Sequence, residues 1–283
     1  NVLSMLAALG YKTAFIGKVG GDYFGKMLGN TIKRIGISDE GLIYDNGANT
    51  TLAIVHTMAD GDRDFSFYRK PGADIMLEEK DVCKELIEHC RIFHFGSLSL
   101  TDEPAASATK AAVTYAKEIG KWISFDPNLR KPLWIDLEQA RAAIWYGIRE
   151  CDILKIADDE IKWLTGVNDY DQGVKIIREH SKAKLINVTL GKNGSISYYS
   201  NKKIFGQPFL SKDTVDTTGA GDTFCASVLA FILENGLNNL EKDQLEQMLL
   251  FANAAASIVT TRKGAICSMP NKEEVCALIV NRI

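Results

Sequence analysis

The 283-residue sequence has almost no excess of charge of one sign, with 33 basic and 36 acidic residues and a formal net charge of −3. Its lysines and arginines are dispersed rather than gathered in a stripe, so the electrostatic footprint of a nucleic-acid-binding protein is lacking. The sequence also contains no run of 18 apolar residues and no secretory signal pattern. We therefore expect no nucleic-acid or membrane partner and a cytoplasmic location.

Cysteine and histidine patterns typical of metal or redox sites are lacking as well. None of the six cysteines belongs to a CxxC pair, and the four histidines are scattered along the chain. Zinc and redox motifs are therefore not supported, and we expect the cysteines to be buried free thiols. The residues concerned are Cys83, Cys90, Cys151, Cys225, Cys267 and Cys276, with His56, His89, His94 and His180.

What the chain does have is enough apolar sequence, 46% of its residues, for one large core with a small appendage. From residue 77 onward, helical and strand-like segments alternate, which is typical of a parallel sheet covered by helices on both faces. Residues 37–70 break this alternation with short β-type runs separated by turn-forming groups. The sequence therefore predicts an α/β core with an inserted antiparallel sheet.

Particular segments carry these expectations. Asp22 is expected to cap a helix over residues 22–35. In the insertion, the turn-forming groups are Asp45-Asn46-Gly47 and Asp60-Gly61-Asp62. We expect strands there at residues 41–44, 51–58 and 63–68, and a helix at residues 77–90 just beyond it.

The most informative stretch is DTTGAGDTF, residues 216–224, which leads directly into an apolar, helix-forming run. A small-residue turn before a helix leaves backbone N–H groups unpaired at the positive end of the helix dipole, which suits a phosphate. Asp222 lies in this anion hole, where a carboxylate can take the proton of a hydroxyl that attacks the phosphate. The alternative is a tight turn in which Asp222 only caps the helix.

Two other phosphate-binding motifs can be checked against the same residues. The dinucleotide fingerprint GxGxxG fails because Phe224 stands where its third glycine belongs, and GxxxxGK[ST] occurs nowhere in the chain. Polar or glycine-containing loops follow five of the expected strands, and in open α/β sheets ligands bind outside the carboxyl ends of the strands. These loops, which we expect to converge on one cleft, lie at residues 20–21, 96–97, 126–130, 158–160 and 191–194.

The nine residues 216–224 resemble the second signature of the PfkB sugar kinases, the ribokinase family. Further similarities spread the resemblance over essentially the whole chain, at residues 19–25, 124–130, 188–194 and 251–256. The resemblance implies a three-layer α/β/α ribokinase-like fold, with a mostly parallel central sheet and a small antiparallel β lid. It implies a nucleotide- and sugar-binding core of residues 1–36 and 71–283 and a lid of residues 37–70.

The resemblance also assigns the chemistry around Asp222. It implies that Asp222 is the catalytic base, that ATP is the phosphate donor, and that the anion hole is formed by Gly219, Ala220 and Gly221. Glu160 aligns with the glutamate of the family's NxxE motif, which positions Mg²⁺ through water, although Ala157 replaces the asparagine. An acidic helix start favoured by the helix dipole is the alternative for Glu160.

Other positions match the nucleotide and cation sites of the family. The matches on the nucleotide side are Lys155, Thr189, Gly191, Gly194 and Asn253. Lys155 is a candidate phosphate contact, and the alternative is a solvated surface lysine. Asp216 and Thr218, together with the loop of residues 262–268, resemble the monovalent cation site of potassium-activated members, so K⁺ is a second candidate ion beside Mg²⁺.

The resemblance places a sugar beside Asp222. Asn1 matches the asparagine of a motif that follows a first strand and a Gly-Gly turn, so we expect that the sequence is truncated at its front and lacks this N-terminal strand. In the lid, alternating aromatic and polar residues are typical of a half-covered strand, and Arg69 is expected to point toward the sugar. The lid is also expected to form a homodimer contact. The remaining sugar contacts are Asn128 and Arg130, for which a plain turn at residues 126–128 is the alternative.

Several segments, among them residues 67–74, 95–100 and 124–134, most resemble the bacterial fructokinase branch of the family. This implies transfer of the γ-phosphate of ATP to the 6-hydroxyl of D-fructose. A 2-keto-3-deoxygluconate kinase, another ribokinase-like kinase and a catalytically silent sugar- or nucleotide-binding protein of the same fold remain alternatives. An NAD-dependent oxidoreductase is disfavoured by the missing third glycine of GxGxxG.

Overall fold

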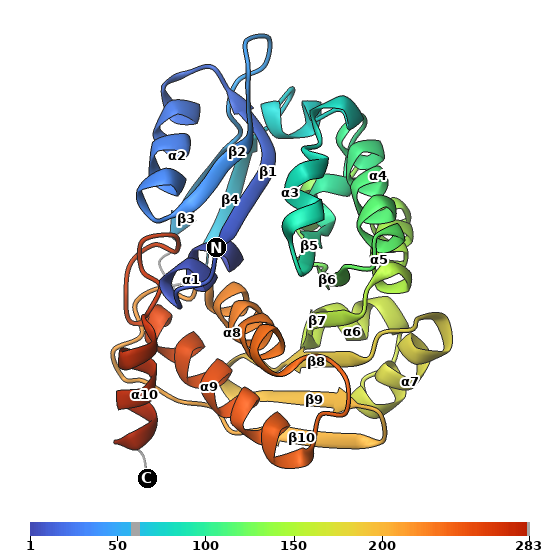
Figure 1. Cartoon of the computed structure of the whole chain (residues 1–283), viewed down its shortest axis with the longest axis vertical. Coiled ribbons are helices and arrows are strands. Elements are labelled where there is room, and N and C mark those ends of the chain that lie inside the picture. Colours follow the sequence, from blue (N-terminus) through green and yellow to red (C-terminus); the bar gives the residue numbers. More distant parts are fainter. Residues whose placement is uncertain (58–62, 282–283) are drawn as a thin grey trace.

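The computed structural model describes residues 1–57 and 63–281 of the chain (Figure 1). Its strands are β1 (Thr13–Gly20), β2 (Ile37–Asp45), β3 (Leu52–Thr57), β4 (Arg63–Tyr68), β5 (Ile92–Gly96), β6 (Trp122–Asp126), β7 (Ile153–Ala157), β8 (Leu185–Thr189), β9 (Ser195–Tyr199) and β10 (Lys202–Gly206). Its α-helices are α1 (Val2–Ala8), α2 (Tyr23–Arg34), α3 (Lys84–His89), α4 (Ala105–Glu118), α5 (Leu137–Glu150), α6 (Asp158–Thr165), α7 (Tyr170–His180), α8 (Ala220–Asn235), α9 (Lys242–Thr260) and α10 (Lys272–Val280).

The central sheet has six strands in the order β10-β9-β8-β7-β6-β5. Strands β5 to β8 run parallel, with Phe95 of β5 opposite Phe125 of β6. Parallel strands covered on both faces are expected to be apolar throughout, and the burial of β6, β7 and β8 fits this rule. The antiparallel strands β9 and β10 complete the sheet, although the sequence pattern had predicted neither.

Helices cover both faces of this sheet, as the sequence predicts (Figure 1). Successive side chains of a strand point to opposite faces, and two cores result. Leu154 and Ile186 belong to the core packed by α4, α5, α6 and α7, whereas Ile153 and Leu185 belong to the core packed by α1, α8, α9 and α10. The three-layer α/β/α fold is therefore confirmed.

The insertion differs from the expectation at its first strand. Residues 37–45 form β2, which pairs parallel with β1 as a separate two-stranded sheet, so the prediction of an antiparallel sheet beginning at residue 37 is wrong there. Strands β3 and β4 form the expected antiparallel pair. Met58 and the predicted turn Asp60-Gly61-Asp62 lie outside the described residues. Pairing partners are set by contacts distant in sequence, which a local alternation pattern does not contain.

The helix expected over residues 77–90 is also wrong in its first half. This segment contains a short 3₁₀ turn (Glu79–Asp81), extended residues at Val82 and Cys83, and then α3. Two tertiary contacts hold the turn: Leu77 packs in a small cluster with Ala105 of α4, and Asp81 forms a 2.5 Å ion pair with Lys18 of β1. Tertiary contacts therefore override the local helical pattern here.

The cap predicted for α2 is present. The Asp22 carboxylate accepts a 2.8 Å hydrogen bond from the Gly25 N–H and a 2.7 Å bond from the Thr50 N–H. It thereby satisfies a free donor of the first helical turn and ties α2 to the segment between β2 and β3. No helix within the described residues is long and apolar enough to cross a membrane.

Gly194→Ala is expected to lower the free energy of unfolding by roughly 1–3 kcal/mol. Gly194 has a φ of 92°, and a Cβ there would lie 2.2 Å from the carbonyl oxygen of Gly206. Gly191 in the same turn also has a positive φ, 55°, but a Cβ there meets no atom within 4 Å. Urea denaturation should therefore show a smaller loss for Gly191→Ala, and equal losses in the two variants would contradict the steric explanation.

Candidate active site

The signature stretch forms the N-terminus of α8, as its sequence predicts. Gly219 is the N-cap residue with a φ of 84°, a left-handed conformation that favours glycine, and Asp222 lies in the first helical turn. The N–H groups of this turn have no acceptor within the helix, although the Ala220 N–H donates a 3.3 Å hydrogen bond to the carbonyl oxygen of Thr217. The positive end of the helix dipole also lies here. The turn can therefore bind an anion, with a carboxylate at its edge.

The glycine at position 221 is explained by a close neighbour. A Cβ there would lie 3.2 Å from Nζ of Lys155, which comes from β7. The Lys155 ammonium therefore lies directly against the turn that precedes Asp222. A fixed positive charge at this place adds to the field of the helix N-terminus.

Asp222 lines a cavity of about 260 Å³ at the carboxyl ends of β5 and β6. Asn1 reaches the same carboxylate, since its Nδ2 donates a 2.7 Å hydrogen bond to Oδ2 of Asp222. Of the predicted sugar contacts, the cavity brings together Asp222 and Asn128, with Asn1 hydrogen-bonded beside them. The residues that line the cavity are His94, Gly96, Leu98, Ser99, Asp126, Asn128 and Asp222.

A buried ion pair forms the floor between the sheet and α8. Nζ of Lys155 lies 3.1 Å from Oδ2 and 3.2 Å from Oδ1 of Asp126, and both side chains are buried. Burial by itself lowers the pKa of Lys155, but the carboxylates of Asp126 and Glu160 outweigh burial and raise this pKa above its usual range. Burial raises the pKa of Asp126, and the Lys155 charge opposes that rise. Lys155 is thus a permanent cation and not a solvated surface lysine.

Glu160 is the second buried carboxylate of this region. Its Oε1 accepts a 2.7 Å hydrogen bond from the Leu129 N–H, and its Oε2 accepts a 2.8 Å bond from the Ala157 N–H. Burial raises the pKa of Glu160, against the charge of Lys155. Glu160 therefore fastens the loop after β6 to the start of α6, a role that the sequence pattern did not reveal.

The loop after β6 presents one predicted residue to the cavity and turns the other away. Asn128 has a φ of 45° and its N–H donates to the Asp126 carboxylate over 3.1 Å, so the loop folds back on the buried pair. Arg130 is exposed and its guanidinium donates to the carbonyl oxygens of Asn128 and Leu129, at 3.5 and 3.3 Å. Arg130 does not line the cavity.

Arg69 is buried and engaged on all sides. Its guanidinium lies 2.6 Å from Oδ2 of Asp74 and donates to Oγ1 of Thr101 and to the carbonyl oxygen of Leu98, at 2.8 and 2.9 Å. It does not line the cavity, but Leu98 does. Arg69 thus holds the loop that forms one wall of the cavity.

The residues expected on the nucleotide side form a separate group. Thr189 ends β8, Gly191 and Gly194 form the turn to β9, and Nδ2 of Asn253 on α9 donates a 2.9 Å hydrogen bond to Oγ of Ser195. None of them lines the cavity at Asp222. The buried Asn253 ties α9 to the sheet beside this turn.

The residues expected to bind a monovalent cation join two loops. The Asp216 carboxylate accepts hydrogen bonds from the N–H groups of Thr218 and Gly264, at 2.8 and 3.1 Å. The signature stretch and the loop of residues 262–268 are therefore in contact. In residues 1–57 and 63–281, no three His, Cys, Asp or Glu side chains gather into a group that could hold a metal.

The sequence pattern missed the contribution of His94 on β5. It placed only residues 96–97 at the cleft, whereas Leu98 and Ser99 of the 3₁₀ turn (Ser97–Leu100) line the cavity as well. His94 was placed with the scattered histidines. Its position two residues before the end of a short apolar strand was the available signal, because polar side chains at strand ends of an α/β sheet face the ligand site.

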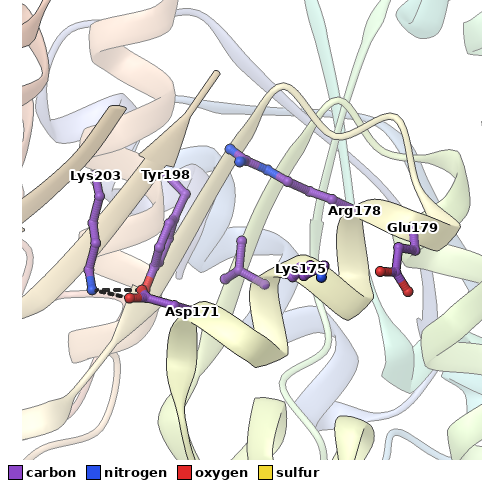
Figure 2. A pocket seen from close by; sticks show the side chains of 7 residues that line it. Asp171, Lys175, Arg178, Glu179, Tyr198 and Lys203 are labelled. Carbon is purple, nitrogen blue, oxygen red and sulfur yellow. Dashed lines mark hydrogen bonds and ion pairs between the residues drawn. The ribbon is translucent and has the colours of Figure 1, made fainter. Parts of the chain in front are cut away.

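A larger hollow of about 450 Å³ lies between α7 and strands β9 and β10 (Figure 2). Its carboxylate Asp171 is already paired, with Lys203 at 2.6 Å and with the hydroxyl of Tyr198 at 2.7 Å. Val174, Lys175, Arg178 and Glu179 complete the lining. This hollow contains none of the predicted site residues, so the smaller cavity at Asp222 is the candidate active site.

A carboxylate at a helix N-terminus, in the wall of a cavity at the carboxyl ends of parallel strands, is the arrangement of an α/β phosphotransferase. Residues 1–272 match the pfkB family carbohydrate kinase description, and the chain belongs to this family. The predicted resemblance is thereby confirmed.

Named relatives are similar over nearly the whole chain. Fructokinase-1 of Oryza sativa subsp. japonica is 40% identical over 279 residues, which cover 99% of this chain and 86% of the relative. Fructokinase-2 of Solanum lycopersicum is 40% identical over 279 residues, which cover 99% of this chain and 85% of the relative. The similarity therefore includes both the core and the inserted strands.

Solved structures agree with the fold. The fructokinase of Xylella fastidiosa with bound ATP superposes with a TM-score of 0.92 at 28% identity, covering 99% of this chain and 89% of that one. The fructokinase of Vibrio cholerae O395, bound to fructose, ADP and calcium ion, gives a TM-score of 0.87 at 27% identity, covering 98% of this chain and 89% of that one.

Proposed function

We propose that the protein is an ATP-dependent kinase that transfers the γ-phosphate to the 6-hydroxyl of D-fructose and releases fructose 6-phosphate and ADP. The observation that carries this proposal is the position of Asp222, at the N-terminus of α8 and in the wall of a cavity of about 260 Å³. Fructokinases similar over nearly the whole chain support the choice of sugar.

In this reaction the sugar oxygen attacks the γ-phosphorus in line while the bond from that phosphorus to the bridging oxygen of ADP breaks. Asp222 takes the proton of the attacking hydroxyl, and the N–H groups at Gly219, Ala220 and Gly221 stabilise the negative charge on the transferring group. Lys155 lies against this turn and adds a permanent positive charge. Asn1, hydrogen-bonded to Asp222, orients the carboxylate toward the sugar.

The remaining predicted contacts fall on either side of this centre. On the sugar side, Asn128 contacts the substrate directly, and Arg69 acts through the Leu98 loop that it holds. Arg130 is proposed as a further sugar contact, for which its guanidinium has to leave the carbonyl oxygens of Asn128 and Leu129. On the nucleotide side, the space beside Gly191, where a Cβ would meet no atom within 4 Å, is open to a nucleotide. The nucleotide contacts proposed here are Lys155, Thr189, Gly191, Gly194 and Asn253.

Mg²⁺ is the proposed divalent ion. Both oxygens of Glu160 already accept backbone N–H bonds, so Glu160 fits a contact through water, as Mg²⁺ keeps several of its waters. When bound with ATP, the ion supplies positive charge to the phosphates. Asp216 and Thr218 are the proposed K⁺ site, where the contact between the signature stretch and residue 264 would be stabilised.

We also propose that residues 37–70 act as a lid, that the lid mediates a homodimer, and that the enzyme works in the cytoplasm. Ile54 on β3 and Tyr68 on β4 are 45% and 64% exposed, and exposed apolar side chains on a two-stranded sheet are stabilised by a partner that covers them. The formal net charge of −3 fits small-molecule substrates.

The alternative of a 2-keto-3-deoxygluconate kinase requires a cation for the substrate carboxylate. Tyr68 and Arg69 of the lid are the candidates for this contact, but Asp74, Thr101 and Leu98 already occupy the guanidinium of Arg69. A carboxylate substrate would have to displace Asp74. This observation favours the neutral sugar fructose.

A coupled ADP-release assay over fructose, 2-keto-3-deoxygluconate, ribose and glucose tests the proposal, with Mg²⁺ present and K⁺ added or omitted. We expect the highest kcat/KM for fructose, with 2-keto-3-deoxygluconate poor. A higher kcat/KM for ketodeoxygluconate or ribose would change the substrate and keep the kinase chemistry. No ADP release with any sugar, together with intact ATP binding, would favour a silent binding protein.

A further inference from the structure

His94 is the only lining residue of the Asp222 cavity with an imidazole, and the chemistry proposed above gives it no task. Its side chain comes from β5, one strand away from the floor of the site, and lines the cavity together with Asp222 and Asn128. Protein atoms enclose most of the ring, and its partly exposed portion belongs to the cavity wall. The nitrogens of an imidazole in this position either form hydrogen bonds within the protein or are available to hydrogen-bond a ligand.

The two ring nitrogens of His94 differ in their surroundings. Nδ1 lies 3.0 Å from Oγ of Ser124 on β6. For Nε2 the structure records no hydrogen-bond partner among residues 1–57 and 63–281. Nε2 is also not one of the fully enclosed side-chain atoms that lack a hydrogen-bond partner in the described residues, so part of its surface is accessible. This nitrogen therefore reaches the space of the cavity.

Ser124 continues the network away from the cavity. Its hydroxyl also hydrogen-bonds the buried thiol of Cys225 on α8, whose pKa is raised by burial, so that the sulfur keeps its proton. One arrangement runs from the thiol through the serine hydroxyl to Nδ1, which leaves Nε2–H as a donor. The reverse arrangement leaves Nε2 as an acceptor. In both cases one hydrogen-bonding position faces the cavity.

The charge state of His94 agrees with this role. Burial lowers the pKa of His94 to about 4, although the Asp222 charge opposes the decrease. The ring is therefore neutral near neutral pH and does not form an ion pair with Asp222. A neutral imidazole can serve a hydroxyl, since a hydroxyl both donates and accepts.

We infer that Nε2 of His94 binds a hydroxyl of the sugar other than the one that is phosphorylated, and that His94 determines which sugars are accepted. The inference rests on the proposed sugar kinase activity and adds a residue that this activity does not name. A site built to hydrogen-bond a hydroxyl rejects an analogue that lacks it, because the polar group of the protein is then left without a partner.

The test uses His94→Phe, which keeps a planar ring and removes both nitrogens, and His94→Gln, whose side-chain amide can place a polar group near the position of Nε2. We expect His94→Phe to lower kcat/KM for fructose about 10- to 100-fold, mostly through KM. The KM for ATP should stay within about twofold, and His94→Gln should recover part of the loss. His89→Gln is the matched control, because His89 lies exposed at the end of α3.

A set of fructose analogues, each lacking one non-reacting hydroxyl, is used to measure discrimination in kcat/KM between fructose and each analogue. A purely structural role of His94 would not change this discrimination. In the wild-type protein one analogue should lose about as much kcat/KM as His94→Phe loses with fructose, and His94→Phe should not distinguish that analogue from fructose. Full kcat/KM for fructose in His94→Phe, or unchanged discrimination against every analogue, would overturn the inference.

The wild-type measurements separate this outcome from failure of the proposed function. If the wild-type protein phosphorylates another sugar instead of fructose, the assignment of fructose fails, and the same variants are measured with deoxy analogues of that sugar. If His94→Phe does not fold, the analogue series on the wild-type and His94→Gln proteins still tests the inference. A wild-type enzyme with the same kcat/KM for fructose and for every analogue would have no sugar hydroxyl bound to Nε2, and the inference would be wrong.

Discussion

Asp222→Asn is expected to lower kcat by roughly 10²- to 10⁴-fold, the usual contribution of a general base. Asparagine has nearly the same volume, and its oxygen can still accept the hydrogen bond from Nδ2 of Asn1, which spans 2.7 Å in the wild-type protein. The side chain therefore stays in place but no longer takes a proton. The anion hole at the N-terminus of α8 is unchanged, so ATP should still bind.

The measurement combines steady-state ADP release with calorimetric binding of ATP. Asp213→Asn is the matched control, because Asp213 is an exposed acid of the loop before the signature stretch, and its hydrogen bond to Oγ of Ser211 comes from its backbone N–H, which the substitution keeps. It should retain wild-type kcat. Turnover within threefold of the wild-type value in Asp222→Asn would contradict the assignment of Asp222 as the base.

Local sequence patterns were sufficient wherever local chemistry decides the structure. The apolar runs that became β6, β7 and β8 are bounded by helical segments, and a strand buried on both faces has to be apolar throughout. The Gly219 turn and the cap of α2 by Asp22 follow from backbone freedom and free N–H groups, which depend on the residues themselves.

Contacts distant in sequence account for what the patterns missed. The parallel pairing of β2 with β1 and the break in the helix near Val82 both depend on neighbours from other segments. Arg69 was expected to point toward the sugar, because Asp74, Thr101 and Leu98, which hold its guanidinium, are brought to it only by folding. A histidine in an apolar strand resembles an ordinary core residue, and only the cavity distinguishes His94.

The buried charges of the candidate site also depend on contacts distant in sequence, which the sequence patterns do not contain. Lys155 is predicted as a phosphate contact and Glu160 as a magnesium contact, and both roles remain predictions. The structure adds that both carboxylates, Asp126 and Glu160, share the charge of one lysine. The pKa values of side chains that are far apart in sequence therefore depend on each other, and removal of one charged group shifts the pKa values of the others.

Lys155→Met should accordingly destabilise the protein by about 3–5 kcal/mol near neutral pH, because it leaves a buried carboxylate without its counter-ion. Nζ of Lys155 lies 3.1 Å from Oδ2 of Asp126, an oxygen with no other hydrogen-bond partner among the described residues. Lys162→Met is the control: Lys162 forms a 3.8 Å ion pair with Asp158 at the surface, and such pairs contribute at most about 1 kcal/mol.

The pH dependence identifies the charge as the cause. Burial already raises the pKa of Asp126, and loss of Lys155 removes the opposing effect. A carboxyl group with a folded-state pKa above its unfolded value destabilises the protein increasingly as pH rises from the unfolded pKa toward the folded one. In urea denaturation, the loss of unfolding free energy in Lys155→Met should therefore be smaller at pH 5 than at pH 8.

The double variant Lys155→Met with Asp126→Asn should recover part of the lost unfolding free energy at pH 8, since it removes the uncompensated charge. A deficit that is the same at both pH values and in the double variant would mean that lost packing, and not the buried carboxylate, explains the role of Lys155.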